Sequence, residues 1–467
     1  MNIFFGAGKL GKKYCAFWKE WGFAVDCFMD NNPVLWYKRI EGLEVIPPEE
    51  LKNFSKDINI LITCVNWEPI WLQLRELGVR DHQIKRCDTD STMLTALRTL
   101  PSHQPPLKTP DDTKCYPRNV LFCLDQGLVL GGVERWSLDT AKELRNLGWN
   151  ASLLLNREAQ AAICEHDETT MKAVYIEDST ELGYLTQIKD TMIQYRNIIC
   201  NFSGRDLMAA SLIKRRFPTQ YRVIAVIHND EEIYYQSYMD AESYLDKCLV
   251  ISSKMGAEMV NRGFPKEKLM YLPWKIPCSE VLSHCYSQWN EPLRIGYAGR
   301  VVTEQKRADL LITVAKKLKE RDIDFRMEIA GTGGYEEELR LQIQTAGLEN
   351  KVHCLGILKD IEPFWARQDI MITCSEWEGH SISQCEAMAE GVVPVVTDTS
   401  GVRDDIENGV NGFIVNVGDI NQMVERLCFL YANRERLPEF GKRAHETILK
   451  RSQSFDIQKL WESILLK

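Results

Sequence analysis

The sequence lacks a long apolar run, a paired cysteine motif and an excess of basic residues. No apolar run approaches the ~20 residues that a membrane-spanning helix needs, and no signal-peptide pattern precedes Ile3-Phe4-Phe5. The 15 cysteines are scattered with no C-x-x-C pair, which argues against a zinc ribbon and against a thioredoxin-type site. A net charge of −9 argues against a general nucleic-acid binder. These absences favour a soluble protein in a reducing compartment, and we expect it to be cytoplasmic.

What is present is an α/β pattern that extends over several domains. A chain of 467 residues implies two to four domains of roughly 100–200 residues each. Predicted strands alternate with predicted helices, which indicates parallel sheets covered by helices on both faces. We expect five segments: a small Rossmann-like α/β domain at 1–100, a proline-rich linker at 101–118, two α/β domains at 119–275 and 276–454, and a C-terminal helix at 455–467.

The first predicted domain opens with a glycine turn between two strands. We expect a strand over 2–5, a helix over 12–21 and a second strand over 23–29. A possible nucleotide site would consist of Gly6, Gly8, Gly11 and Asp30, because an acid about 20 residues after such glycines is typical of a ribose-binding turn. The pattern is too short for two mononucleotide-binding halves. Residues 5–11 (FGAGKLG) and 28–33 (FMDNNP) resemble the small Rossmann-like N-terminal domain of bacterial sugar acyltransferases, which holds a nucleotide sugar. A structural module without a ligand is the alternative.

Two features lie at predicted strand ends within 119–275. Gly131 and Gly132 precede a helix, where paired glycines allow a ligand to approach the backbone closely. His228 stands directly after a strand over 221–227, at the carboxyl end, where ligands of open α/β sheets bind. At this position His228 is either a functional group or a structural histidine.

The loop and helix within 374–394 combine two carboxylates with a helix N-terminus. Glu378 and Glu386 stand eight positions apart, and Ser381 and Ser383 are good N-caps for a helix over about 383–390. First-turn amides, the positive end of the helix dipole and two carboxylates suit a ligand such as a nucleotide sugar, which is anionic at one end and rich in hydroxyls at the other. The alternative is a capping box of Ser383 and Glu386, in which Glu386 only closes the helix end.

Basic residues follow another predicted strand, over 293–299. Arg300 and Lys306 suit a pyrophosphate, one as a bidentate donor and the other as a point charge. The alternative for each is a solvated surface charge. The D-x-D triplets at 88–90 and 322–324 lie in charged surroundings, and we expect both to be solvated, which agrees with a site that uses no metal ion and no cofactor.

From Asn119 to Lys467 the order of the motifs resembles glycosyltransferase family 4. The resemblance is carried by Gly131-Gly132-Val133-Glu134-Arg135, His228, Ser252-Ser253-Lys254, Gly299-Arg300 with Lys306, and Glu378 with Glu386 before Ala387-Met388-Ala389. It implies the GT-B fold, in which two Rossmann-like domains face each other across a cleft. It also implies retaining, metal-independent transfer of a sugar from a nucleotide-sugar donor to a glycan, lipid-linked or polymer acceptor, as in cell-surface polysaccharide biosynthesis.

The resemblance also assigns the residues of the site. The catalytic residues that it implies are His228, Arg300, Lys306 and Glu378. The donor-binding residues that it implies are Gly131, Gly132, Arg300, Lys306, Gly356, Glu378, Gly379, His380, Ser381 and Glu386. The sequence departs from the family pattern at Pro273-Trp274-Lys275, where Pro-Asn-Gly is usual, and at Glu378-Gly379-His380-Ser381, where Glu-Gly-Phe-Gly is usual. The second departure leaves the donor sugar open.

Other functions and partners also stay open. The alternatives are a GT-B sugar-nucleotide epimerase, a sugar-nucleotide-binding scaffold without turnover, and a hydride transfer at the first glycine turn. The sequence does not specify the base, sugar, acceptor, linkage or oligomeric state. Lys214-Arg215-Arg216 would suit a peripheral contact at the inner face of an anionic membrane. Three basic residues fall short of the about 4–8 that signal lipid binding, so a solvated helix end is the alternative.

Overall fold

The computed structural model describes residues 1–20, 24–54, 58–64, 67–80, 83–86, 118–124, 131–156, 172–176, 181–202, 204–272, 274–454 and 456–466. The predicted linker up to residue 117, the D-x-D triplet at 88–90 and Pro273 lie outside them. The chain divides into two compact units, one of Met1–Leu130, Ser137–Val226 and Glu232–Cys248, the other of Gly131–Trp136, Ile227–Glu231 and Leu249–Lys467. The segment boundaries predicted from the sequence stay predictions.

The first sheet has six strands in the order β3-β4-β2-β1-β5-β6. They are β1 (Asn2–Phe5), β2 (Cys27–Met29), β3 (Arg39–Ile40), β4 (Leu43–Ile46), β5 (Asn59–Ile62) and β6 (Ile84–Arg86), with α1 (Lys9–Glu20) and α2 (Glu68–Glu76) between them. The pairs are parallel except β3 with β4. Two predicted boundaries are wrong. Helix α1 begins before residue 12, because the Lys12 N–H already bonds to the Gly8 carbonyl. Strand β2 begins at Cys27, because among the residues described from 24 onward the pairing with β1 starts there.

The second sheet has seven strands in the order β13-β12-β11-β10-β7-β8-β9. The strands are β7 (Asn119–Leu124), β8 (Asn150–Asn156), β9 (Lys172–Ile176), β10 (Asn197–Cys200), β11 (Arg222–Ile227), β12 (Lys247–Val250) and β13 (Leu269–Tyr271). The helices between them are α4 (Gly132–Asn146), α5 (Glu181–Met192), α6 (Arg205–Arg216), α7 (Glu232–Ala241) and α8 (Ser253–Asn261). Strands β7 and β10 are buried along their whole length, as expected where helices cover both faces of a parallel sheet.

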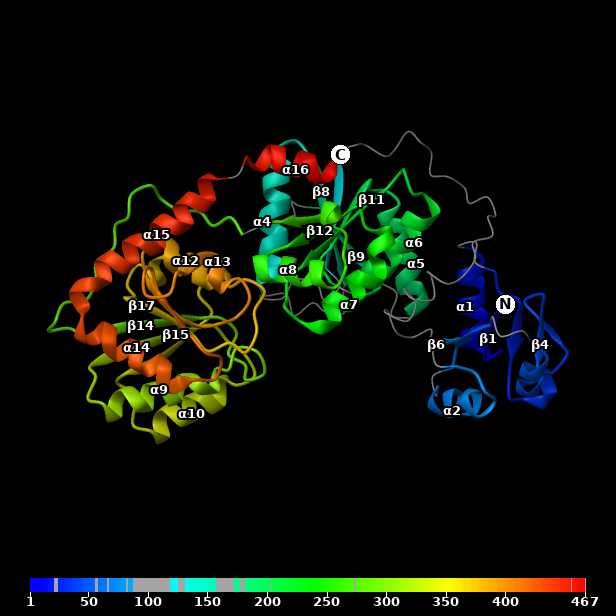
Figure 1. Cartoon of the computed structure of the whole chain (residues 1–467), viewed down its shortest axis with the longest axis horizontal. Coiled ribbons are helices and arrows are strands. Elements are labelled where there is room, and N and C mark those ends of the chain that lie inside the picture. Colours follow the sequence, from blue (N-terminus) through cyan, green and yellow to red (C-terminus); the bar gives the residue numbers. More distant parts are fainter. Residues whose placement is uncertain are drawn as a thin grey trace. The chain divides into compact units, whose positions relative to one another are not determined.

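The third sheet has six parallel strands in the order β16-β15-β14-β17-β18-β19. The strands are β14 (Leu293–Ala298), β15 (Phe325–Ala330), β16 (Val352–Gly356), β17 (Ile370–Thr373), β18 (Val393–Thr397) and β19 (Phe413–Val415). The helices are α9 (Asp309–Glu320), α10 (Glu336–Thr345), α11 (Glu362–Trp365), α12 (Ile382–Ala389), α13 (Val402–Asp405), α14 (Ile420–Ala432), α15 (Leu437–Gln453) and α16 (Ile457–Leu465). Helices α9, α10 and α14 lie on one side of this sheet, and α12, α13 and α15 on the other (Figure 1).

The strand order of the third sheet reverses between β14 and β17. The chain runs from β14 to β15 and β16 on one side and then returns to β17 on the other side of β14. The loops after β14 and β17 therefore leave in opposite directions, and ligands of open α/β sheets bind at such a point. Both predicted cations and the carboxylate Glu378 follow these two strands.

The fold class predicted from the sequence is confirmed. The described residues form three α/β sheets, and the second and third sheets repeat the Rossmann-type order in which the first strand lies inside the sheet. Among the described residues, none of the helices combines the length and the apolar character that crossing a membrane would require.

Candidate functional site

The carboxyl ends of β14 and β17 carry an ion pair. Arg300 and Lys306 belong to the loop after β14, and Glu378 belongs to the loop after β17. Lys306 Nζ pairs with Glu378 Oε1, and their side chains are 17% and 9% exposed. The structure therefore joins directly two residues that the sequence predicted as separate ligand-binding groups.

Two neighbours hold the Glu378 carboxylate in place. Ser375 Oγ donates to Glu378 Oε1 at 2.7 Å, and Gln305 Nε2 donates to Glu378 Oε2 at 3.5 Å. Arg300 Nη2 donates to Gln305 Oε1, so Gln305 connects the guanidinium to the carboxylate. The sequence reasoning missed Gln305; the available signal was its position in the loop that carries Arg300 and Lys306.

The loop after β17 packs against the backbone of His228. A side chain at Gly379 would overlap the His228 carbonyl oxygen, so only glycine fits there. His228 is 5% exposed, and its ring lies edge-on to Trp136 with 5.1 Å between the ring centroids. Burial lowers the pKa of His228 to about 3, so the imidazole is neutral at physiological pH. The structure thus brings His228 beside the Glu378-Gly379 backbone.

Protein side chains fill the space beside the paired glycines. A Cβ atom at Gly131 would overlap Glu134 Oε2, and one at Gly132 would lie 3.0 Å from Ile382 Cδ1. Glu134 is 3% exposed, and burial raises the pKa of its carboxyl to about 7, although nearby Arg300 acts to lower it. Glu134 therefore belongs to the surroundings of Arg300. Sequence reasoning did not select it, and the signal was an acid inside the glycine motif.

The N-terminus of α12 corrects one alternative for Glu386. The N-cap is Ser381, whose Oγ accepts a hydrogen bond from the Gln384 N–H at 3.3 Å. The helix begins at Ile382, one residue earlier than predicted, so Ser383 is already inside it. The proposed capping box of Ser383 and Glu386 is therefore wrong, because the third helical position belongs to Gln384. The role of Glu386 as a ribose ligand stays a prediction.

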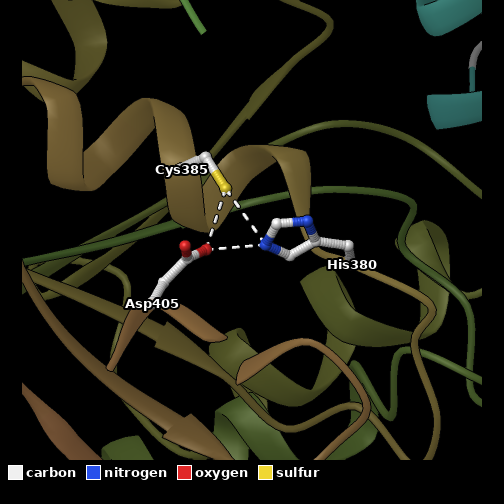
Figure 2. A group of neighbouring side chains, drawn as sticks. All are labelled: His380, Cys385 and Asp405. Carbon is white, nitrogen blue, oxygen red and sulfur yellow. Dashed lines mark hydrogen bonds and ion pairs between the residues drawn. The ribbon is translucent and has the colours of Figure 1, made fainter. Parts of the chain in front are cut away.

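Two other predicted donor-binding residues lie outside the ion pair. The His380 ring points toward Asp405 and Cys385 (Figure 2), with 2.6 Å between His380 Nε2 and Asp405 Oδ2. Gly356 ends the edge strand β16, which is separated from β14 by β15. Their donor-binding roles stay predictions. The His380 ring is paired with Asp405, so the main chain of His380 is the part that stays available to a donor.

The glycine turn of the first sheet encloses its own acid. Asp30 Oδ2 accepts a hydrogen bond from the Ala7 N–H, and Asp30 Oδ1 accepts one from the Asn32 N–H, both at 2.8 Å. Gly11 has no room for a Cβ atom because the Gly6 carbonyl lies there, whereas Gly8 faces open space. The structure brings the predicted residues together, and a nucleotide site at this turn stays a prediction.

The remaining predictions concern surface charges. Lys214 Nζ pairs with Asp246 Oδ1 at 2.8 Å and donates to the Tyr221 carbonyl oxygen at 2.8 Å. One of the three basic residues predicted to suit a membrane is thus engaged within the protein. In the second D-x-D triplet, Asp324 pairs with Lys351 at 3.2 Å.

Comparison with known proteins finds a family match for the segment that carries Arg300, Lys306 and Glu378. Residues 287–447 match the family Glycosyl transferases group 1. The poly(ribitol-phosphate) alpha-N-acetylglucosaminyltransferase of Staphylococcus aureus strain COL is 29% identical over 168 residues, which cover 36% of this chain and 34% of the relative. The putative colanic acid biosynthesis glycosyltransferase WcaL of Escherichia coli K12 is 27% identical over 212 residues, which cover 44% of this chain and 52% of the relative. The chain thus spans between about a third and about half of these relatives.

Solved structures extend the likeness beyond the matched segment. TarM of S. aureus has a TM-score of 0.61 at 14% identity, covering 75% of this chain and 99% of TarM. HepE of Anabaena in complex with UDP-glucose has a TM-score of 0.62 at 17% identity, covering 74% of this chain and 98% of HepE. At these identities the likeness shows the fold, and it confirms the GT-B fold predicted from the motifs, with an additional N-terminal region.

Proposed function

We propose that this chain is a retaining glycosyltransferase. Residues 287–447 match the group 1 glycosyltransferase family, and this match confirms the predicted resemblance. The chain would transfer a sugar from a nucleotide-sugar donor to a glycan, lipid-linked or polymer acceptor. The observation that carries the proposal is the Lys306–Glu378 ion pair beside Arg300 at the carboxyl ends of β14 and β17. A polymer acceptor, as in cell-surface polysaccharide biosynthesis, is supported by the names of two relatives, one of which states poly(ribitol-phosphate) and the other colanic acid biosynthesis.

The cations would bind the donor diphosphate. Arg300 and Lys306 offer a planar donor pair and a mobile ammonium group, which suit phosphate oxygens. Lys306 now pairs with Glu378, so an arriving diphosphate would draw the ammonium group toward itself. Negative charge on the diphosphate grows as the bond to the sugar breaks, and cations already in place stabilise that charge without reorganisation.

The carboxylate would then bind the sugar. A Glu378 oxygen that Lys306 releases can accept hydrogen bonds from sugar hydroxyls, while Ser375 and Gln305 keep the group oriented. His228 lies against the same loop as a neutral imidazole. A neutral ring can donate or accept a hydrogen bond to the sugar or the acceptor without placing a second positive charge at the anomeric carbon.

We propose that the transfer needs no metal ion, because side-chain cations supply the positive charge at the diphosphate. The test is nucleotide release in EDTA, with and without added Mg²⁺ or Mn²⁺. Full activity in the chelator is expected. Loss on chelation that either ion restores would contradict the proposed role of Arg300 and Lys306.

A sugar-nucleotide epimerase is the second candidate, and Glu134 is the observation that favours it. Its raised pKa would suit a carboxyl that gives and takes a proton near physiological pH. An epimerase would convert the donor sugar without an acceptor and without net release of nucleotide. A transferase would release nucleoside diphosphate in proportion to acceptor.

The decisive experiment is a donor screen followed by an acceptor assay with the full chain. Thermal shifts with UDP-, GDP-, ADP- and CMP-sugars identify the donor, since a ligand at 100 times its Kd adds ~2.7 kcal/mol of stability. Release of nucleoside diphosphate is then measured with and without poly(ribitol phosphate) and other glycan acceptors. NMR of the product anomer tests retention. Donor binding without nucleotide release with any acceptor, and without conversion of the donor sugar, would leave a sugar-nucleotide-binding scaffold.

A further inference from the structure

Three buried side chains and one partly buried side chain form a second charged cluster next to the predicted donor loop. They are His380 before α12, Cys385 on α12, Asp405 at the end of α13 and Arg451 on α15. His380 Nε2 donates to Asp405 Oδ2 at 2.6 Å, and Arg451 Nη1 donates to Asp405 Oδ1. The side chains of His380, Asp405 and Arg451 are 1%, 1% and 11% exposed. We call these four residues the His380 cluster.

The His380 cluster is charged at neutral pH. Burial acts to lower the pKa of His380, but Cys385 and Asp405 outweigh it and raise the pKa to about 10. Burial acts to raise the pKa of Asp405, but His380 and Arg451 lower it to about 2. An imidazolium and a guanidinium therefore share one carboxylate, one on each oxygen. Such a buried pair contributes a specific arrangement of the segments that it joins, because any other arrangement leaves a charge unpaired.

The cluster does not have the geometry of a nucleophilic triad. In a triad the nucleophile and the acid contact different nitrogens of the histidine. Here Cys385 Sγ and Asp405 Oδ2 both face His380 Nε2, at 3.6 and 2.6 Å (Figure 2). His380 Nδ1 is buried and has no hydrogen-bond partner, so neither residue is placed to use it.

A metal site is also less well supported by the same atoms. One ligand atom each from His380, Cys385 and Asp405 lies within 4.8 Å of the others, and zinc accepts this set of ligands. However, the Arg451 guanidinium already binds the carboxylate. A histidine ligand to a metal almost always donates from its second nitrogen to a partner, and His380 Nδ1 lacks one.

His380 is the residue by which the donor loop is held. It lies between Glu378, which pairs with Lys306, and Ser381, which caps α12. Any disturbance of the main chain at His380 therefore reaches both the carboxylate and the first-turn amides of α12.

The backbone at Gly401, which packs against the donor loop, is equally constrained. Gly401 has φ +79, and a Cβ atom there would lie 2.8 Å from the Gly379 carbonyl oxygen and 3.2 Å from His380 Cα. Asp405 follows Gly401 in α13, and Arg451 ties Asp405 to α15. The loop is thus packed on the backbone at Gly401 and joined to two helices through one carboxylate.

We propose that the His380 cluster positions the loop 378–381 for the donor sugar, so that His380 acts through the main chain and its ring does not contact the donor. This inference rests on the proposed function, because it takes the donor to bind at that loop. It replaces the direct donor contact predicted for His380 with the role of a positioning residue.

The test compares H380A, H380Q and D405N with D398N in the full chain. Asp398 pairs with Arg403 of α13 at 2.6 Å, with side chains 32% and 69% exposed, so D398N breaks an ion pair on the same helix outside the cluster. Calorimetry gives the Kd values for UDP and UDP-glucose. Hydrogen exchange of residues 378–383 and the melting temperature are measured on the same samples.

We expect H380A and D405N to weaken UDP-glucose binding at least tenfold and UDP binding less than threefold, because the loop faces the sugar. H380Q should fall between H380A and the wild type, since its amide can still donate to Asp405. Exchange at 378–383 should accelerate at least tenfold in H380A and D405N. D398N should stay within twofold of the wild type in every measurement.

Four other results overturn the inference. Unchanged exchange at 378–383 would show that the cluster does not hold the loop. A lower melting temperature with an unchanged ratio of the two Kd values would make the cluster structural only. Weak binding in H380A but not in D405N would mean that the ring contacts the donor. Melting that responds to EDTA in the wild type but not in C385S would mark a metal site. If the wild type binds no nucleotide sugar and exchange still accelerates in the variants, the proposed function has failed, whereas the positioning of the loop by the His380 cluster stands.

Discussion

The carboxyl ends of β1 and β14 are built on the same local strand order, yet the acids beside them have different partners. At β1, Asp30 accepts two hydrogen bonds from backbone N–H groups of its own turn. At β14, Lys306 pairs with Glu378, which arrives from the loop after the neighbouring strand β17. Backbone donors cannot leave Asp30 without unfolding the turn, whereas a lysine ammonium moves on a flexible stem. We therefore expect an acid whose partner can be exchanged to be the better ligand group.

The largest effect is expected from breaking the Lys306–Glu378 ion pair. K306M should lower turnover by about 10²–10³-fold, the scale of removing one preorganised group that stabilises developing charge. It also leaves Glu378 without its cation, so the melting temperature should fall. Steady-state nucleotide release measures the effect. K316M, which removes an exposed lysine of α9, is the matched control, and an equal loss in both variants would contradict the role of Lys306.

The second prediction concerns Glu134, whose pKa is raised mainly by burial. The pKa of Glu134 rises from 4.5 to about 7 in the folded chain, so the unfolded chain loses this proton first as the pH rises. The stability contribution is present below pH ~4.5 and is lost up to pH ~7. Relative to E134Q, the wild type should lose about 3 kcal/mol of unfolding free energy across this window.

Urea denaturation of wild type and E134Q at pH 4.5, 6 and 8 measures this difference. E134Q keeps the shape of the Glu134 side chain and does not titrate. At low pH, where Glu134 is protonated, E134Q therefore serves as the control for the wild type. A constant difference between the two proteins at all three pH values would mean that Glu134 is ionised throughout and is held by Arg300.

The third prediction separates the ligand role of Glu386 from helix capping. E386Q should weaken donor binding by roughly 1.5–3 kcal/mol, or 10- to 150-fold, because charge-assisted bonds to two ribose hydroxyls become neutral. The melting temperature should stay nearly constant, since Ser381 is the cap. S381A should instead lower stability by ~0.5–2 kcal/mol. Unchanged donor affinity in E386Q, measured by calorimetry, would remove Glu386 from the site.

The smallest effect is expected from a change at Asp30, beside the carboxyl end of β1. D30N should lower the unfolding free energy by about 1–2 kcal/mol, because its two backbone donors lose a charged acceptor. Donor affinity and turnover should not change, because the Asp30 carboxylate is committed to its own turn. Reduced nucleotide binding in D30N would assign a ligand to the glycine turn of the first sheet.

Local sequence patterns predicted where helices and strands lie better than where these elements begin and end. The strands before Arg300 and Glu378, the helix after Gly132 and the C-terminal helix all lie where periodicity indicated. The capping box at Ser383 failed because two serines two positions apart both satisfy the cap pattern. Which of them takes the cap depends on where the preceding loop leaves the sheet, and that is set by packing on His228 and Gly401.

The sequence by itself determined which residues stand at strand ends, because glycines, caps and apolar periods act over a few neighbouring positions. It therefore placed Arg300, Lys306, His228 and Glu378 at carboxyl ends of strands. Only the tertiary structure decided their partners. Lys306 and Glu378 are 72 positions apart, and His380 and Asp405 are 25 apart. Such pairs form only once the strand order brings loops together, and burial then sets which groups carry charge.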